Sequence, residues 1–170
     1  MQRKFVVAAV LLALAIAAPR LAGAQDDTKA EKELRAIGAR WADAFRRKDA
    51  DALIKLYVPG KSLVVFDVIP PRQYVGSDAY RQDFKSFFDS FKGPIKLEVS
   101  DYFVSARGGM GYARSIQHVV GRDANGRRVD VTVRSTDCFQ KIDGKWYIVH
   151  EHVSVPVDLN TAKADLQSKP

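Results

Sequence analysis

The 170-residue sequence contains a single cysteine, Cys138. One cysteine excludes an internal disulfide framework and leaves no cysteine cluster for a structural zinc site. Glycine and proline are also few, at 11 and 7 residues, which excludes collagen-like and low-complexity chains. With 46% hydrophobic and 28% charged residues, the composition is that of one globular domain stabilised by a packed core.

The apolar run at the N-terminus, Phe5 to Ala18, is shorter than the roughly 20 residues that a membrane-spanning helix needs. Arg3 and Lys4 precede it, and the A-x-A cleavage pattern Ala22-Gly23-Ala24 follows. This order predicts a secretory signal peptide over residues 1–24. No cysteine follows the run, so a lipoprotein anchor is not expected. We therefore expect a periplasmic or secreted protein without membrane attachment after cleavage.

Basic residues exceed acidic ones by 27 to 20, a formal charge of +7, but part of this excess belongs to the predicted signal. Without its three basic residues, 24 basic residues remain and the charge falls to +4. The two densest basic clusters, 46–48 and 127–128, each lie beside an aspartate. There is no basic stripe with interleaved aromatics, so nucleic acid is not an expected partner.

Apolar residues at helical spacing predict three helices in the first half of the mature chain, over residues 29–48, 50–57 and 77–92. The apolar stripe of the first is Leu34, Ile37, Trp41 and Phe45. Asp49 is the predicted N-cap of the second. A short apolar strand, 63–66, separates the second helix from the third.

Alternating apolar and polar residues follow, and they predict long strands over 95–107, 110–122, 127–142 and 145–157. Asn125-Gly126, between two of them, favours the positive φ values of a type I′ hairpin turn. The polar tail, 158–170, has no periodic pattern and is expected to be a loosely held extension.

Helices followed by a strand meander predict an α+β fold, with three N-terminal helices packed on one face of a curved antiparallel sheet. The predicted strands exceed the usual five or six residues, and long antiparallel strands coil and bend. The concave face is therefore a natural place for a pocket roofed by helices.

Two stretches carry a resemblance to a known family. The opening helices with Trp41, Tyr57 and Tyr74-Val75-Gly76, and the closing segment GKWYIVHEHVSVP from Gly144, resemble the SnoaL-like branch of the nuclear transport factor 2-like superfamily. The resemblance implies a cone-shaped α+β barrel over residues 25–157, with a deep cavity, and usually a homodimer. The superfamily includes ketosteroid isomerase, scytalone dehydratase and many binding proteins, so the fold does not choose a reaction.

Two histidines stand out in the closing segment. Strand geometry places His150 and His152 on one face and Glu151 on the other. The resemblance implies that the histidines line the cavity and bind a polar ligand group; the alternative is that they only satisfy polar neighbours. With Asp67 or His118 they could share a metal ion, but no metal motif supplies a third ligand, so no metal or cofactor is expected.

Arg134, Thr136 and Cys138 share one face of the preceding strand. The resemblance favours Arg134 in the pocket, where a desolvated guanidinium needs a carboxylate from the protein or from the ligand. This implies anion binding; the alternative is a surface arginine paired across strands. Cys138 lacks an activating base at a suitable spacing and is expected to be a small core or cavity-lining residue.

Asp67 follows the short apolar strand, where a merely solubilising aspartate is common. By resemblance it matches the proton-shuttling aspartate of ketosteroid isomerase, although Trp41 stands where that enzyme has its oxyanion-donating tyrosine. Scytalone dehydratase, which uses a histidine and an aspartate as acid and base, is the other precedent. Tyr57 and Tyr74 are expected to line the cavity because a hydroxyl on an apolar ring suits a small organic ligand.

We therefore expect an exported protein that binds a small polar, anionic or aromatic molecule in the barrel cavity. The predicted ligand-binding residues are Tyr57, Tyr74, Arg134 and Thr136. The alternative is a cofactor-free isomerase, dehydratase or cyclase with Asp67, His150 and His152 as its catalytic acid and base.

Overall fold

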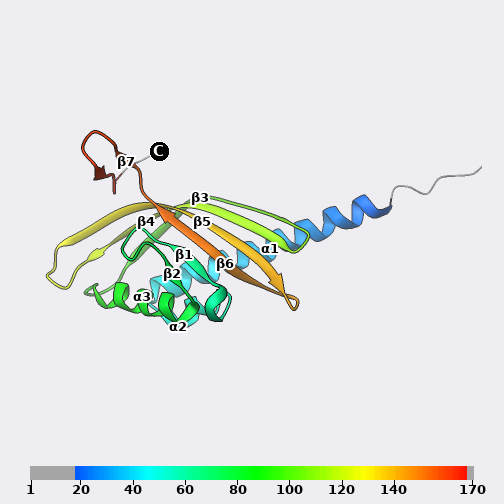
Figure 1. The fold of residues 1–170 in the computed structure, drawn as a ribbon, viewed down its shortest axis with the longest axis horizontal. Helices are drawn as coiled ribbons and strands as arrows, with labels where there is room; N and C mark the ends of the chain where they lie inside the picture. The colour runs from blue at the N-terminus through cyan, green and yellow to red at the C-terminus, as the bar shows by residue number, and fades with distance from the viewer. Residues whose placement is uncertain (1–17, 168–170) are drawn as a thin grey trace, which may run out of the picture.

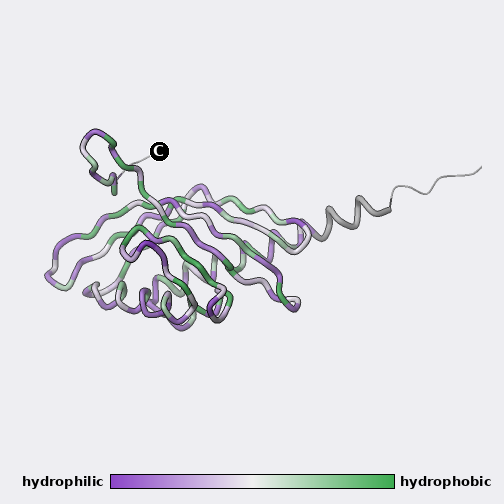
Figure 2. The backbone as a smooth tube through the Cα atoms, in the orientation of Figure 1, coloured by the Kyte–Doolittle hydropathy of each residue, from purple (hydrophilic) through white to green (hydrophobic). Residues whose placement is uncertain are grey.

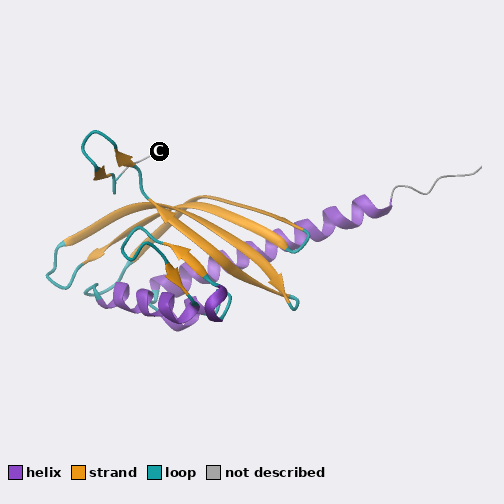
Figure 3. Ribbon diagram, in the orientation of Figure 1, coloured by secondary structure: helices purple, strands orange, loops and turns teal. Residues whose placement is uncertain are grey.

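The protein folds as one curved sheet with three helices packed on one of its faces (Figure 1, Figure 3). The computed structural model describes residues 18–167, with side chains from residue 27, so most of the predicted signal peptide lies outside the described residues. The six strands lie in the order β2-β1-β6-β5-β4-β3. The predicted α+β fold, with N-terminal helices on a mostly antiparallel curved sheet, is confirmed.

The three helices are α1 (Ala18–Arg46), α2 (Ala50–Ile54) and α3 (Ser77–Asp89), with a 3-10 turn at Gly60–Ser62. The predicted apolar stripe of α1 is buried. Asp49 caps α2 as expected, because its Oδ1 accepts a hydrogen bond from the Ala52 N–H at 2.8 Å. The second helix ends earlier than predicted because residues 56–58 leave it to bond with Ile148 of the sheet.

The strands are β1 (Val64–Phe66), β2 (Tyr74–Val75), β3 (Lys96–Arg107), β4 (Met110–Arg122), β5 (Arg128–Ile142) and β6 (Lys145–Ser154). All pairings are antiparallel except that of β1 with β6. Hydropathy alternates along the long strands in Figure 2, as expected when one face is buried and the other meets water. The register shifts once in the β3–β4 pair and once in the β5–β6 pair.

Residue pairs with the positive φ values of a type I′ turn lie at two other hairpins, not at the one predicted. Gly108 and Gly109, between β3 and β4, have φ values of 57° and 82°. Asp143 and Gly144, between β5 and β6, have φ values of 48° and 78°. At the β4–β5 connection only Gly126 is left-handed, with φ of 80°, and Asn125 is not. The Asp123 N–H donates instead to the Arg127 carbonyl, which closes a wider loop. Asn125-Gly126 thus correctly predicted a turn at this position, but the turn is not of type I′.

The core fills the space between the helices and the concave face of the sheet. Aromatic rings from α1 and α3 meet there: Phe45 packs against Phe87 and Phe88, with ring centroids 5.7 and 5.2 Å away. Tyr57 packs edge-on against Tyr80 at 5.4 Å. These contacts hold α3 against α1 and leave a hollow between the helices and the sheet.

The C-terminal segment has regular structure that its lack of a periodic pattern did not predict. It forms a small hairpin of two short strands, β7 (Val157–Asp158) and β8 (Lys163–Ala164), which follows the end of β6 in Figure 1. The Thr132 N–H of β5 donates a 2.7 Å hydrogen bond to the Leu166 carbonyl. Over the part of the chain that the structure describes, no helix is both long and apolar enough to cross a membrane.

Candidate functional site

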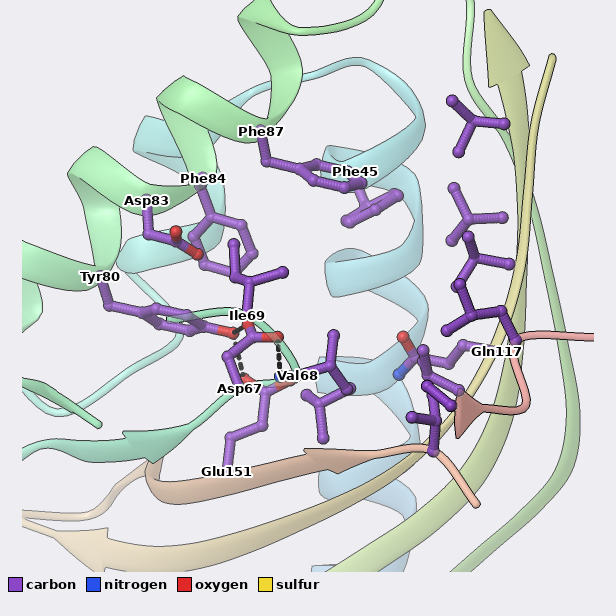
Figure 4. Close-up of a pocket in the computed structure, with 18 of the residues that line it drawn as sticks. Phe45, Asp67, Val68, Ile69, Tyr80, Asp83, Phe84, Phe87, Gln117 and Glu151 are labelled. Carbon is purple, nitrogen blue, oxygen red and sulfur yellow. Dashed lines mark hydrogen bonds between the residues drawn. The ribbon is translucent and has the colours of Figure 1, made fainter. Parts of the chain in front are cut away.

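A cavity of about 370 Å³ lies between the helices and the inner face of the sheet (Figure 4). Its walls are mostly apolar. Aromatic rings of α1 and α3 form one side, and valines of β4, β5 and β6 form the other: Trp41, Phe45, Phe84, Phe87, Val119, Val129, Val131, Val133 and Val153. Among the described residues that line it, none is Lys, Arg or His.

The polar groups of the cavity include three carboxyl groups, those of Asp67, Asp83 and Glu151. Figure 4 shows them on the same side of the hollow as Tyr80. The Tyr80 hydroxyl lies 3.2 Å from Glu151 Oε2 and 3.4 Å from Asp67 Oδ2. Because this hydroxyl has one proton, it donates to only one of them at a time. The second carboxyl group can then bond to the Tyr80 oxygen only if it is protonated and donates its own O–H.

Glu151 is the most deeply buried of these carboxyl groups, with 2% of its surface exposed. Its Oε2 accepts a 2.5 Å hydrogen bond from Tyr57, whose hydroxyl accepts one of 2.8 Å from Trp41 Nε1. Burial, followed by the charge of Asp137, raises the pKa of Glu151 well above its ordinary value. The hydrogen bonds from the two tyrosines oppose this rise but do not cancel it. Burial therefore favours the neutral, protonated form of Glu151.

Asp137 is the cross-strand neighbour of Glu151, and both residues point inward from the sheet. Ser135 donates a 3.2 Å hydrogen bond to its Oδ1. Burial raises the pKa of Asp137 to about 7. Two adjacent carboxyl groups in a poorly hydrated place resist ionising together, so this pair holds at least one proton at neutral pH.

Asp67 and Asp83 are only partly buried, unlike Glu151. Burial is the main cause of the raised pKa of Asp67, and the charge of Asp83 adds to it. The Val68 N–H, 2.6 Å from Asp67 Oδ1, acts in the opposite direction. Burial also raises the pKa of Asp83, against a 2.7 Å hydrogen bond from the Tyr74 hydroxyl. Burial thus disfavours the charged form of Asp67, while the Val68 N–H stabilises it.

The two histidines of β6 lie on the outer face of the sheet, outside the cavity. Cys138 pairs with His150 and Phe139 with Ile148, so Val149 is an extra residue without a partner on β5. This β-bulge reverses the alternation along the strand. Trp146 and Ile148 face the core before it, and Glu151 and Val153 face the cavity after it.

The expectation that His150 and His152 line the cavity is therefore wrong. His150 Nδ1 lies 2.7 Å from the Val64 carbonyl oxygen, and the Phe66 ring stands edge-on to both imidazoles. Asp67 lies on the other side of the sheet, so it shares no metal site with them. Among the side chains of residues 27–167, no three from His, Cys, Asp or Glu gather as a metal site would require.

Arg134 and Thr136 also differ from the expectation, because both are exposed on the outer face of β5. The anion site predicted from Arg134 is absent from the described cavity wall. Tyr57 and Tyr74 do not line the cavity either. They stand behind it and donate hydrogen bonds to Glu151 and Asp83, so they position the carboxyl groups. Among the predicted site residues, only Asp67 lines the cavity.

The model of a SnoaL-like domain matches residues 34–158 of the chain. The chain belongs to the SnoaL-like domain family. No curated protein matches its sequence. A solved structure of a nuclear transport factor 2-like protein of unknown function from Pseudomonas putida KT2440 is 30% identical, with a TM-score of 0.76 over 84% of this chain and 98% of that one.

Two more distant solved structures share the fold of this SnoaL-like domain. A putative scytalone dehydratase from Novosphingobium aromaticivorans is 17% identical, with a TM-score of 0.67 over 78% of this chain and 89% of that one. A ketosteroid isomerase-like protein from Erwinia carotovora atroseptica is 20% identical, with a TM-score of 0.62 over 73% and 94%. They confirm the nuclear transport factor 2-like fold of the SnoaL-like domain and do not assign its reaction.

Sequence reasoning missed three carboxyl groups, those of Glu151, Asp83 and Asp137. One signal was available for Glu151. Within the expected strand it shares a face with Val149, Val153 and Val155, and a glutamate among valines is a candidate buried acid. Asp83 and Asp137 offered no comparable signal, because an aspartate on an amphipathic helix or strand ordinarily faces water.

The buried acids of the SnoaL-like domain predict that its stability falls as pH rises from 5 to 8. In the folded state the pKa of Asp137 is raised from 3.8 to about 7, so the folded chain keeps a proton that the unfolded chain releases. The stabilisation is complete below pH 4 and is lost as the pH passes through 7. We expect a decrease on the order of a few kcal/mol in unfolding free energy, measured by urea denaturation.

Asp137→Asn should flatten this pH dependence, because the amide does not titrate. Asp51→Asn is the matched control, since Asp51 lies on the surface and its pKa is lowered by Arg81. A slope between pH 5 and 8 that is the same in Asp137→Asn and in the unaltered chain would contradict the assignment.

Proposed function

We propose that the SnoaL-like domain binds a small, neutral and largely apolar molecule that carries one polar group. The observation that supports this most directly is the composition of the cavity wall: apolar side chains, carboxyl groups and no basic residue among those described. An anionic ligand bound in this cavity would lie near Asp67 and Asp83 with no cation to compensate its charge. The ligand class expected from Arg134, an anion, is therefore not the one proposed.

The size of the cavity agrees with this ligand class. At about 370 Å³ it lies within the range of roughly 300–1,000 Å³ that is usual for small-molecule sites. The rings of Phe45, Phe84 and Phe87 face valines across it, which suits a flat ring system. We place the polar group of the ligand near Asp67, where Tyr80 and the neutral Glu151 offer hydrogen-bond donors.

The binding proposal predicts that a neutral fluorescent probe such as N-phenyl-1-naphthylamine binds with enhanced emission. The anionic probe 1-anilinonaphthalene-8-sulfonate should bind more weakly, because its sulfonate meets the carboxylates. Val131→Phe should fill the cavity and weaken neutral-probe binding by about ten-fold. Fluorescence titration measures all three.

The control is Thr136→Phe, on the outer face of the same strand, which should leave neutral-probe binding unchanged. Tighter binding of the sulfonate than of the neutral probe would contradict the proposed ligand class. An equal loss of neutral-probe binding in Val131→Phe and Thr136→Phe would show that the probe binds outside the cavity.

The second candidate function is cofactor-free proton transfer, which the setting of Asp67 favours. In this reaction the Asp67 carboxylate removes a proton from the carbon beside a ligand carbonyl. Tyr80 or Glu151 donates a hydrogen bond to the enolate oxygen, and Asp67 then returns the proton to the ligand. The roles expected for His150 and His152 pass to these groups because the histidines lie outside the cavity.

Proton transfer predicts deuterium incorporation next to the carbonyl of a bound cyclic ketone in deuterated water, followed by NMR. Asp67→Asn should reduce the enzymatic rate by at least about 100-fold, because the amide cannot accept the proton. Asp89→Asn, at the exposed end of α3, should keep the full rate. Full exchange in Asp67→Asn would exclude Asp67 as the base, and binding without exchange in the unaltered chain would favour a binding protein.

We further propose that a second copy of the chain covers the outer face of the sheet, in keeping with the homodimer that the resemblance implies. Phe66, Phe103, Met110 and Tyr112 are exposed there, and Phe103 contacts Tyr112 with ring centroids 5.9 Å apart. Tyr112→Glu should convert a dimer into a monomer, measured by light scattering after size exclusion. If the unaltered chain is a monomer in solution, the proposed dimer is refuted.

Export by the signal peptide over residues 1–24 stays part of the proposal. It is supported by the charge and apolar pattern of the N-terminus. A mature chain beginning near Gln25, as measured by mass spectrometry, is its test.

A further inference from the structure

We propose that the C-terminal hairpin, residues 157–167, is a movable wall of the cavity and that the apolar contact of Leu166 controls how long a ligand stays bound. The inference rests on the proposed binding function. Ala164 and Leu166 line the cavity together with the valines of the sheet. Both residues lie beyond the segment that matches the SnoaL-like domain, which ends at residue 158.

The hairpin occupies a place that the sheet leaves open. The pairing of β6 with β5 stops at Ser154 and Arg134, although β5 extends back to Arg128. Along this unpaired edge the Thr132 N–H donates a 2.7 Å hydrogen bond to the Leu166 carbonyl oxygen. The returning chain therefore substitutes for β6 and brings an apolar side chain to the edge of the cavity.

The hairpin lies away from the acidic end of the cavity. Figure 4 shows the carboxyl groups of Asp67 and Asp83 near α3, and the pale red strand of the hairpin beside Gln117, across the hollow. A ligand whose polar group lies at Asp67 therefore points its apolar part towards Leu166. The hairpin would contact the part of the ligand that carries no hydrogen bond.

The hairpin is also the part of the wall that costs least to displace. The rest of the wall belongs to α1, α3, the long strands β4 to β6 and the loop after β1, whereas β7 and β8 pair over two residues each. Leu166 is 41% exposed and Leu159 is 92% exposed, so little apolar surface holds the hairpin down. Short, exposed elements with few buried contacts open locally at a fraction of the cost of global unfolding. We infer that ligands enter and leave by displacing this hairpin.

The test is stopped-flow fluorescence with N-phenyl-1-naphthylamine on the full-length chain. Leu166→Asn removes the apolar contact and should raise the probe dissociation rate by about five-fold or more. Leu159→Asn is the matched control, since it makes the same change in the same hairpin at a residue that does not line the cavity. Its dissociation rate should equal that of the unaltered chain.

A second measurement reports on the hairpin directly. The Thr132 amide should exchange its proton faster than the amides of the β4–β5 ladder, and bound probe should slow that exchange. Equal dissociation rates in Leu166→Asn and Leu159→Asn, or a Thr132 amide as protected as its neighbours, would overturn the inference. If the unaltered chain does not bind the probe, the proposed function itself fails.

Discussion

The burial of the Glu151 carboxyl group is the constraint on which the arrangement of this site depends. A carboxyl group away from water is tolerated only when it is neutral or well supplied with hydrogen bonds. Here Tyr57 and Tyr80 reach the same oxygen, and Trp41 supports Tyr57 from behind. These residues come from α1, the segment after α2, α3 and β6. Satisfying one acid therefore fixes how the helices sit on the sheet and where the cavity lies between them.

The same hydrogen-bond network gives the carboxyl groups different environments. Glu151 and Asp137 are neighbours across β5 and β6, and burial raises the pKa of both, so the pair is a source of pH-dependent stability. The Tyr80 hydroxyl, 3.4 Å from Asp67 Oδ2, joins Asp67 to this network, and Asp67 also lines the cavity. A protein with one buried neutral acid and one partly buried carboxylate in the same hollow has both a donor and an acceptor for a neutral ligand, without any cation.

Much of the fold was predictable because it depends on patterns that repeat. The helical stripe ending at Phe45, the cap at Asp49 and the alternation in the long strands each predicted the observed element. The site was less predictable because it depends on single residues that break a pattern. The extra residue Val149 changes which face His150 occupies, and alternation alone cannot locate such a bulge. Arg134 was misplaced by the resemblance, since strand periodicity alone left its face open.

This bulge has a chemical consequence beyond its geometry. In a regular β6 the two imidazoles would point into the hollow and Glu151 would point out, which would suit an anionic or metal-bound ligand. One additional residue exchanges the two faces, so the cavity receives a carboxyl group and valines, and the imidazoles pass to the outer face beside Phe66. The charge preference of the cavity thus follows from backbone register as much as from residue identity. Resemblance in this segment therefore transfers the fold of the family more securely than the roles of its side chains.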